Sequence, residues 1–277
     1  MDIQKNLTLI NVASSIRLEI VEAGYALVDR TWCHSSVCSP YSRLYYVTGG
    51  EGSLFIDGKE KLLTPGNAYL IPTGFLYDYR CRDSMEKLYF HVNVMLPNGF
   101  DLFYGLKDLS SIPMSPESFD QLKELFFAGD PESSIKLKGR LYEDTAAFAG
   151  KTGADAKIRQ TYSRLLSQMF LLTQQPVSAR NTVRSLAERL HVSESTLSKR
   201  FKQETGMTAG AYLEQVLMRK ACQLLLATDY SLSRIAEELD FTDQFYFSRS
   251  FKHYTGVPPS VYRRTQKINE GISIIQE

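Results

Sequence analysis

Residues Phe241–Tyr262 read FTDQFYFSRSFKHYTGVPPSVY, and this stretch carries the beginning, the two faces and the end of one helix. Thr242 can cap the first turn through its hydroxyl, and Asp243 places a negative charge at the positive end of the helix dipole. Gly256 can adopt the left-handed conformation that ends a helix, and the Pro-Pro pair that follows cannot continue it. The stretch therefore predicts a helix with a defined start and stop.

The apolar and polar side chains of this helix fall on opposite faces. Phe247, Phe251 and Tyr254 recur at helical spacing, which predicts one buried face. The opposite face carries aromatic, hydrogen-bonding and cationic side chains, namely Phe245, Ser248, Arg249 and Lys252. A helix with hydrophobic anchors behind and such groups in front suits insertion into a DNA groove.

The same pattern occurs fifty residues earlier, in SESTLSKRFKQETG at 193–206. Subtracting fifty pairs Phe251 with Phe201 and Gly256 with Gly206. The outer face repeats as well, with Ser195, Ser198, Lys199 and Lys202 matching Phe245, Ser248, Arg249 and Lys252. Each copy follows a short helix and a tight corner, LAERLHV at 186–192 and IAEELDF at 235–241. The sequence therefore predicts a tandem helix-turn-helix.

The segment 235–263, IAEELDFTDQFYFSRSFKHYTGVPPSVYR, resembles the signature of the AraC/XylS family of bacterial transcription regulators, and the similarity extends over roughly 181–264. The resemblance implies that the chain binds double-stranded DNA. Relatives usually carry Gly before the Phe of the second corner, where this chain has Asp240, and His191 holds the matching place in the first corner. Both residue types tolerate a positive φ, so we expect the corners to form. The family's usual Arg in the joining helix falls at Leu217, so one phosphate contact or internal pair is either missing or supplied by Arg219 or Lys220.

The repeated outer face supplies the predicted DNA contacts. Lys199 and Arg249 are the predicted base readers, because a long cation reaches the acceptors of guanine. Lys202 and Lys252, one turn further on, are predicted to contact phosphates. Five other residues are predicted to supplement them: Ser195, Ser198, Gln244, Phe245 and Ser248, with Phe245 able to meet a thymine methyl group.

The composition indicates a globular protein of two domains with an uneven charge distribution. The 277 residues are 43% hydrophobic and 23% charged, with a net charge of +1. The segment Ala179–Arg264 carries thirteen Lys/Arg and nine Asp/Glu, a net charge of +4, which leaves −3 for the remainder. A basic end on an acidic body fits a nucleic-acid module attached to another domain. The start of the chain has no signal-peptide pattern, no run reaches the ~20 apolar residues of a membrane helix, and four cysteines suit a reduced compartment, so we expect a cytoplasmic protein.

Short apolar runs broken by turn residues fill the chain from Leu18 to about Met95, which predicts an antiparallel barrel or double sheet. The order GEGSLFIDGKEKLLTPGNAYLIPTG at 50–74 resembles the cupin-like arm of AraC-type regulators, which implies a small effector bound inside a barrel. We therefore expect an α+β chain with the following parts: a cupin-like barrel at 1–110, a helical dimerisation segment at 111–175, a linker at 176–181, the DNA-binding domain at 182–265 and a tail at 266–277.

The barrel is predicted to hold an organic effector and no metal or other cofactor. Enzymatic cupins bind metal through histidines and a carboxylate, but Leu76 and Tyr77 stand where a histidine is expected, and the cluster of Cys33, His34 and Cys38 matches no usual zinc spacing. Aromatic rings with polar tips and nearby guanidinium groups suit a small polar molecule such as a sugar, although they also fill barrels or line edges. The predicted effector-binding residues are Arg30, Trp32, Arg43, Tyr79 and Tyr89.

A continuous apolar stripe runs along Ile158, Tyr162, Leu165, Leu166, Met169 and Leu172 and predicts a helix of about four turns. In this family the helix after the barrel commonly supports dimerisation, so the resemblance implies a homodimer; packing against the chain's own barrel is the alternative. RNA polymerase is a candidate partner. No catalytic set is credible, so we expect no enzyme. Two other functions remain open: a cupin-type enzyme fused to a DNA-binding tail, and a regulator whose barrel only dimerises.

Overall fold

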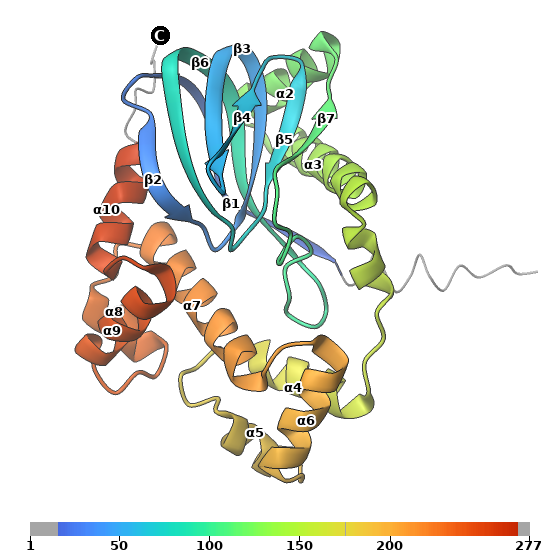
Figure 1. Cartoon of the computed structure of the whole chain (residues 1–277), viewed down its shortest axis with the longest axis vertical. Helices are drawn as coiled ribbons and strands as arrows, with labels where there is room; N and C mark the ends of the chain where they lie inside the picture. Colours follow the sequence, from blue (N-terminus) through green and yellow to red (C-terminus); the bar gives the residue numbers. More distant parts are fainter. Residues whose placement is uncertain (1–15, 175, 271–277) are drawn as a thin grey trace, which may run out of the picture. The chain divides into compact units, whose positions relative to one another are not determined.

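The computed structural model describes residues 16–174 and 176–270, and the chain divides into two compact units (Figure 1). The first unit runs through Arg159 and the second begins at Gln160. The first contains an antiparallel sheet followed by helices, and the second is helical. This is the α+β organisation that the sequence predicts.

Seven strands of the first unit form one antiparallel sheet in the order β1-β6-β3-β5-β7, with β2 paired to β6 and β4 paired to β3. The strands are β1 (Arg17–Asp29), β2 (Cys33–Cys38), β3 (Ser42–Ile56), β4 (Lys59–Leu63), β5 (Asn67–Ile71), β6 (Leu76–Met95) and β7 (Ser110–Pro113). The Asp57-Gly58 turn joins β3 to β4, and both residues have a positive φ, as a tight hairpin requires.

The two long strands β3 and β6 pair along most of their length, with register shifts at Val47/Gly49 and Gly50/Gly52. Gly50 has a φ of 62°, and a Cβ at this position would collide with the carbonyl oxygen of Ser84. Only glycine therefore fits here. Bulges of this kind bend a strand, so both halves of β3 and β6 turn one face toward a shared interior.

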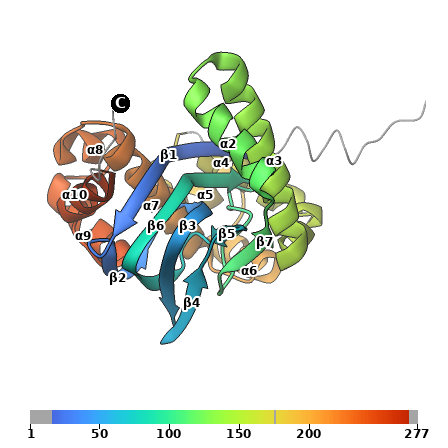
Figure 2. The same ribbon diagram turned by 90° about the horizontal axis from the view of Figure 1, so that it is seen from above.

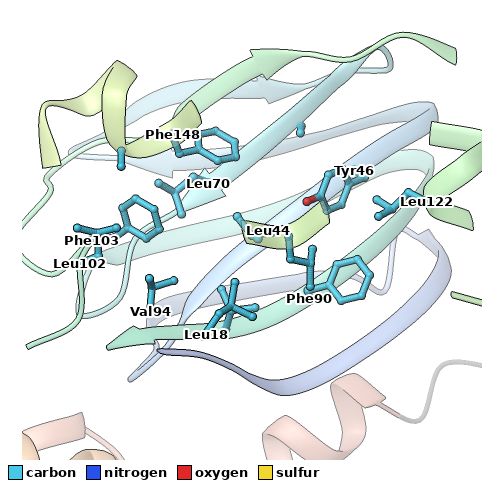
Figure 3. Close-up of a cluster of buried hydrophobic side chains, with 14 of the residues drawn as sticks. Leu18, Leu44, Tyr46, Leu70, Phe90, Val94, Leu102, Phe103, Leu122 and Phe148 are labelled. Atoms are coloured by element: carbon cyan, nitrogen blue, oxygen red, sulfur yellow. The ribbon is translucent and has the colours of Figure 1, made fainter. Parts of the chain in front are cut away.

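The outer face of the sheet is covered by α2 (Pro116–Ala128) and α3 (Pro131–Thr152), which lie along it in Figure 2. Figure 3 shows Leu122 of α2 beside Tyr46 and Phe90 of the sheet, and Phe148 of α3 beside Leu70. The hydroxyl of the buried Tyr46 donates to Asp144 Oδ2 at 2.7 Å. Burial, together with the Asp144 charge, raises the Tyr46 pKa well above its ordinary value, so the hydroxyl keeps its proton.

The second unit is a tandem helix-turn-helix. Its first pair is α5 (Val183–Arg189) and α6 (Glu194–Thr205), and its second pair is α8 (Leu232–Glu238) and α9 (Gln244–Thr255). The helix α7 (Ala209–Ala227) joins the pairs, α4 (Arg164–Gln174) precedes them and α10 (Pro259–Glu270) follows. The segment predicted as a linker at 176–181 belongs to this unit, because the Ala179 N–H donates to the Leu239 carbonyl at 2.8 Å.

The apolar stripe predicted as one continuous helix is divided between the two units. The 3-10 helix η1 (Ala154–Arg159) ends before Gln160, and Ile158 packs against the apolar core of the first unit. The helix α4 starts afresh at Arg164 and buries Phe170 in the second unit, where its ring meets those of Phe201 and Tyr212 edge to face at 5.9 and 5.5 Å. The prediction of one long helix was wrong because helical spacing persists across the break. Of the predicted tail at 266–277, residues 271–277 lie outside the described residues.

Candidate DNA-binding surface and effector site

Each helix-turn-helix pair has the same corner geometry. In the first corner His191 N donates to Glu188 O at 3.1 Å and Val192 N donates to Ala187 O at 3.0 Å. The equivalent bonds of the second corner, from Asp240 and Phe241, are 3.0 and 2.8 Å long. This double hydrogen-bond pattern needs a left-handed residue, and His191 and Asp240 have φ angles of 54° and 57°. The prediction that these residues tolerate a positive φ is confirmed.

We expect His191→Gly to stabilise the second unit by about 1 kcal/mol, because glycine adopts the left-handed conformation without the steric cost of a Cβ. Thermal unfolding of the full chain measures the change. His253→Gly is the matched control, since it places glycine inside α9, where it should destabilise by about 0.5–1 kcal/mol. A His191→Gly variant less stable than the wild type would contradict the expectation.

The two recognition helices are capped by different residues. Ser193 caps α6, and its hydroxyl accepts from Thr196 N at 3.1 Å. Asp243 caps α9, with one carboxylate oxygen accepting from the N–H groups of Phe245 and Tyr246, both at 2.7 Å. The predicted capping role of Thr242 was wrong, because the helix starts one residue later and the carboxylate takes both donors.

The inner faces of both recognition helices are buried as the repeat predicts. Leu197 and Phe201 of α6, and Phe247 and Phe251 of α9, are all fully buried. Tyr254 is 37% exposed and does not complete the apolar face of α9; it lies in the last turn of the helix, which ends at Thr255. The side chains opposite the buried positions therefore form the free surface of the unit.

Most predicted DNA contacts lie on that free surface. Exposed side chains are Ser195, Lys199 and Lys202 on α6, and Phe245, Arg249 and Lys252 on α9, while Ser198, Gln244 and Ser248 are half-buried. Gln244 accepts a hydrogen bond from the Ser233 hydroxyl on α8, so its amide is already engaged within the unit. Tyr246 was missed: it is 49% exposed, and the Arg249 guanidinium lies 6.0 Å from its ring centroid. The aromatic ring steadies the cation that is predicted to read a base.

The two cations considered as replacements for the family's arginine lie differently. Arg219 is buried in α7 and Lys220 is exposed. Arg263 is engaged within the unit, since its guanidinium donates to the carbonyls of Leu225 at 3.0 Å and Tyr230 at 2.6 Å. Of these three residues, Lys220 is the one whose side chain is free to reach a phosphate.

The inner face of the sheet brings together four of the five predicted effector-binding residues. Trp32 stacks on Tyr79 with centroids 4.3 Å apart, and Tyr45 links Trp32 to Tyr89 through ring contacts of 6.4 and 6.5 Å. The fourth, Arg43, is buried and donates to the Tyr45 hydroxyl at 3.1 Å. We define the inner core as two sets of residues. The first is Trp32, Arg43, Tyr45, Tyr79 and Tyr89, and the second is Glu22, Tyr41, Tyr77, Lys87 and His91, also contributed by the bent sheet.

Arg30 does not join the inner core. It lies in the turn after β1, its side chain is exposed, and its Nε donates to the Arg82 carbonyl at 2.8 Å. Side chains alternate between the two faces only within a strand, so the position of Arg30 in a turn does not direct its side chain to the inner face. The structure offers no effector contact for this residue within the inner core.

A half-buried carboxylate, that of Glu22, accepts two hydrogen bonds at one end of the inner core. Glu22 accepts from the Tyr89 hydroxyl at 2.8 Å and from His91 Nδ1 at 2.6 Å. Burial opposes ionisation of Glu22, but the bonds from His91 and Tyr89 and the charge of Arg43 outweigh it and lower its pKa. Burial, with the nearby charge of Arg43, lowers the His91 pKa to about 4. At neutral pH Glu22 is therefore ionised, and His91 is neutral and donates its Nδ1 proton.

Sequence reasoning missed most of the polar residues in the inner core. Along β6, Lys87, Tyr89 and His91 alternate with Leu88 and Phe90. Alternation predicts two faces, but the usual assumption places the polar face in water. In this sheet the apolar face packs against α2 and α3, and the polar face turns toward the interior. Of the five residues 87–91, only Tyr89 is therefore not buried.

A separate surface hollow of about 380 Å³ lies near the start of α2. Its lining includes Glu86, Asp120 and Lys123, and the Lys123 ammonium lies 3.9 Å from Glu86. Two carboxylates and one ammonium group line this hollow, so its net charge is −1. Within residues 16–174 and 176–270, no three His, Cys, Asp or Glu side chains gather to hold a metal ion, and Cys33 and His34 are exposed on β2.

Two family models match the chain. A helix-turn-helix domain matches residues 186–265, and an AraC-like ligand binding domain matches residues 30–188, more than half of the chain. The chain belongs to the AraC/XylS family. It is therefore a DNA-binding transcription regulator with an effector-binding arm. No helix of the described residues has the length and apolar character needed to cross a bilayer.

Relatives of this AraC/XylS chain are regulators of operons. The Msm operon regulatory protein of Streptococcus mutans is 24% identical over 89% of this chain and 92% of its own length. The raffinose operon regulator RafR of Pediococcus pentosaceus is 29% identical over 80% of this chain and 84% of its own. The arabinose operon regulatory protein of Escherichia coli is 24% identical over 80% of each chain. These three relatives give no support to the enzyme alternative.

The fold of the whole chain is similar to that of ToxT from Vibrio cholerae. The crystal structure of an apo ToxT variant has a TM-score of 0.54 and 14% sequence identity, and the match covers 90% of this chain and 96% of that one. At this identity the likeness concerns the fold alone. It supports a sheet-containing arm and a tandem helix-turn-helix in one chain.

Proposed function

We propose that the chain activates or represses an operon in response to a small polar organic effector, such as a sugar, bound in the inner core. The observation that carries this proposal is the matched pair of exposed recognition helices on a buried, repeated scaffold. The names of two relatives, the regulators of raffinose and arabinose operons, support a sugar-related input. A cytoplasmic location, with RNA polymerase as a further partner, fits this function.

The DNA-reading roles divide between base and phosphate contacts. Lys199 and Arg249 are proposed to read bases, because their long side chains are exposed in the middle of α6 and α9. Lys202 and Lys252 follow one turn later and are proposed to hold phosphates. Ser195, Ser198, Phe245 and Ser248 supplement them, while Gln244 would first have to give up its bond from Ser233.

We expect Arg249→Ala to lower discrimination at one or two base pairs by about 1–3 kcal/mol, whereas Lys252→Ala weakens all sequences alike. Affinities for a panel of operator variants, measured at one fixed salt concentration, separate the two effects. If both variants lose affinity uniformly across the panel, the assignment of Arg249 to base reading is wrong.

A homodimer remains part of the proposal, but the structure changes where its contact should be sought. Leu166, Met169 and Phe170 are buried, and the Phe170 ring packs against Phe201 and Tyr212, so this face of α4 supports the chain's own second unit. The helices α2 and α3 of the first unit carry large exposed apolar side chains, with Phe127 59% and Ile135 74% exposed. We propose these helices as the dimer contact, which sedimentation of a Phe127→Glu, Ile135→Glu variant tests.

A further inference from the structure

Lys87 is a buried cation for which the described part of the chain provides no anionic partner. Its side chain lies on the inner face of β6, and the residue is only 3% exposed. The ammonium nitrogen lies 4.1 Å from the ring centroid of Trp32, 3.8 Å from that of Tyr45 and 5.7 Å from that of Tyr89. No described carboxylate oxygen lies within 4.0 Å of it, and no described acceptor lies within 3.5 Å. Ring faces attract a cation, but they do not replace the hydrogen bonds lost with water.

The charges of the inner core do not balance. Arg43 and Lys87 are cations, Glu22 is ionised, and His91 is neutral at pH 7. The Glu22 oxygens are already taken by Tyr89 and His91. With Lys87 protonated, one positive charge is left over in a buried space. A monoanion would neutralise this excess, whereas a dianion would reverse it.

Two further hydrogen-bonding groups of the inner core are incompletely used. The Tyr77 hydroxyl is buried and has no partner among the described residues, and its ring centroid lies 6.0 Å from the Arg43 guanidinium. Arg43 donates to Ser39 Oγ through Nε at 3.2 Å and Nη2 at 2.9 Å, and to Tyr45 through Nη1. These bonds leave some of the five N–H donors of the Arg43 guanidinium available for a ligand. Unpaired buried donors beside an uncompensated cation are the features of a site built for a ligand.

We propose that the inner core binds a small organic monocarboxylate, such as a hydroxy acid or a sugar acid, whose carboxylate pairs with Lys87 and Arg43. The proposal rests on the proposed effector function and specifies the chemical class of the effector. Tyr77 supplies a hydrogen bond to the same molecule, and Trp32 and Tyr45 pack against its carbon skeleton. Lys87 is thus the residue that separates acids from neutral sugars of the same shape.

Binding of a carboxylate should change the pKa of Lys87. Burial, with the charge of Arg43, lowers the Lys87 pKa well below its ordinary value, and a bound carboxylate would raise it again. Binding then takes up a proton, so affinity for the acid should fall as pH rises through the free-protein pKa. The other titratable or charged groups that face Lys87 are Glu22, Arg43, Tyr45, Cys81, Tyr89 and His91. Lys87→Met should remove this pH dependence.

Thermal unfolding of the full chain, with ligands added as sodium salts, tests the assignment. The probes are acetate, glycolate and glucuronate, with sodium chloride and glucose as the ionic and neutral references. Lys87→Met is compared with Lys59→Met, which removes an exposed lysine of β4. We expect the acids to raise the unfolding temperature of the wild type and of Lys59→Met but not of Lys87→Met. Affinity for the tightest acid, from calorimetry, should fall at least ~100-fold in Lys87→Met.

The stability of Lys87→Met without ligand provides a second readout. A methionine of similar shape removes an unpaired buried charge, so the variant should be as stable as the wild type or more stable. A clear loss of stability would show that Lys87 is structural and would overturn the proposal. Acids that stabilise neither protein beyond sodium chloride, or both equally, would overturn it too. If only glucose stabilises both proteins, the assignment of a carboxylate effector is wrong, but the proposed function as an effector-responsive regulator stands. That proposed function fails only if no bound molecule changes the affinity for DNA.

Discussion

Replacing Phe170 by alanine should destabilise the second unit by about 3–5 kcal/mol, although this residue precedes both helix-turn-helix pairs. The Phe170 side chain is 3% exposed, and its ring packs against Phe201 of α6 and Tyr212 of α7. Loss of the ring leaves a cavity directly behind the first recognition helix. Chemical denaturation of the full chain, combined with measurement of DNA affinity, should show both properties reduced.

Leu171 is the matched control for this prediction. It is the next residue of α4 but is 70% exposed, so Leu171→Ala should change stability by less than about 0.5 kcal/mol. Wild-type stability of Phe170→Ala would mean that α4 does not support α6. The same packing predicts that a fragment beginning at Gln160 folds better than one beginning at Ala179, because the shorter fragment leaves Phe201 and Tyr212 uncovered.

DNA affinity should fall roughly 1000-fold between 50 and 200 mM salt if about six phosphates are neutralised. The exposed cations of α6 and α9 motivate this expectation, because each phosphate contact releases counterions. Lys202→Ala and Lys252→Ala should each lower the slope of log affinity against log salt, by up to about one. Fluorescence anisotropy with a labelled operator, over a series of salt concentrations, measures these slopes.

Lys138→Ala provides the control for the salt experiment. Lys138 is an exposed lysine of α3 in the first unit, so its removal changes the net charge equally without touching the recognition helices. It should leave the slope unchanged. A flat salt dependence of the wild type would contradict the assignment of α6 and α9 to the DNA surface.

The sequence predicts the second unit well because two kinds of signal agree there. The repeat fixes which residues face inward, and the caps and corners fix where each helix begins and ends. Leu197, Phe201, Phe247 and Phe251 are buried accordingly, and the corner residue His191 has the expected positive φ. The errors at Thr242 and Tyr254 lie at helix ends, where one residue of shift changes a role.

The first unit could be predicted only in outline. Turn signals and alternation identify an antiparallel sheet, but they do not show which face the helices will cover. By alternation Lys87 and His91 share the face of β6 that carries Tyr79 and Tyr89, but only the two tyrosines were predicted to bind the effector, and the structure buries Lys87 and His91 as well. Arg30 was wrongly assigned to the effector site because a turn residue does not follow the alternation of a strand. The apolar stripe ending at Leu172 was predicted as one helix because its helical spacing continues across the break between η1 and α4.

The different caps of the two recognition helices make them unequal partners for a polyanion. At the start of α9 the Asp243 carboxylate already occupies two backbone N–H groups and adds a negative charge. At the start of α6 the neutral Ser193 hydroxyl accepts only one such bond, although Glu194 in the first turn carries a negative charge there. We therefore propose that the first backbone N–H groups of α6 are more available to a phosphate than those of α9, in addition to the base and phosphate contacts proposed for both helices. This difference would appear as a larger loss of salt slope for Lys202→Ala than for Lys252→Ala.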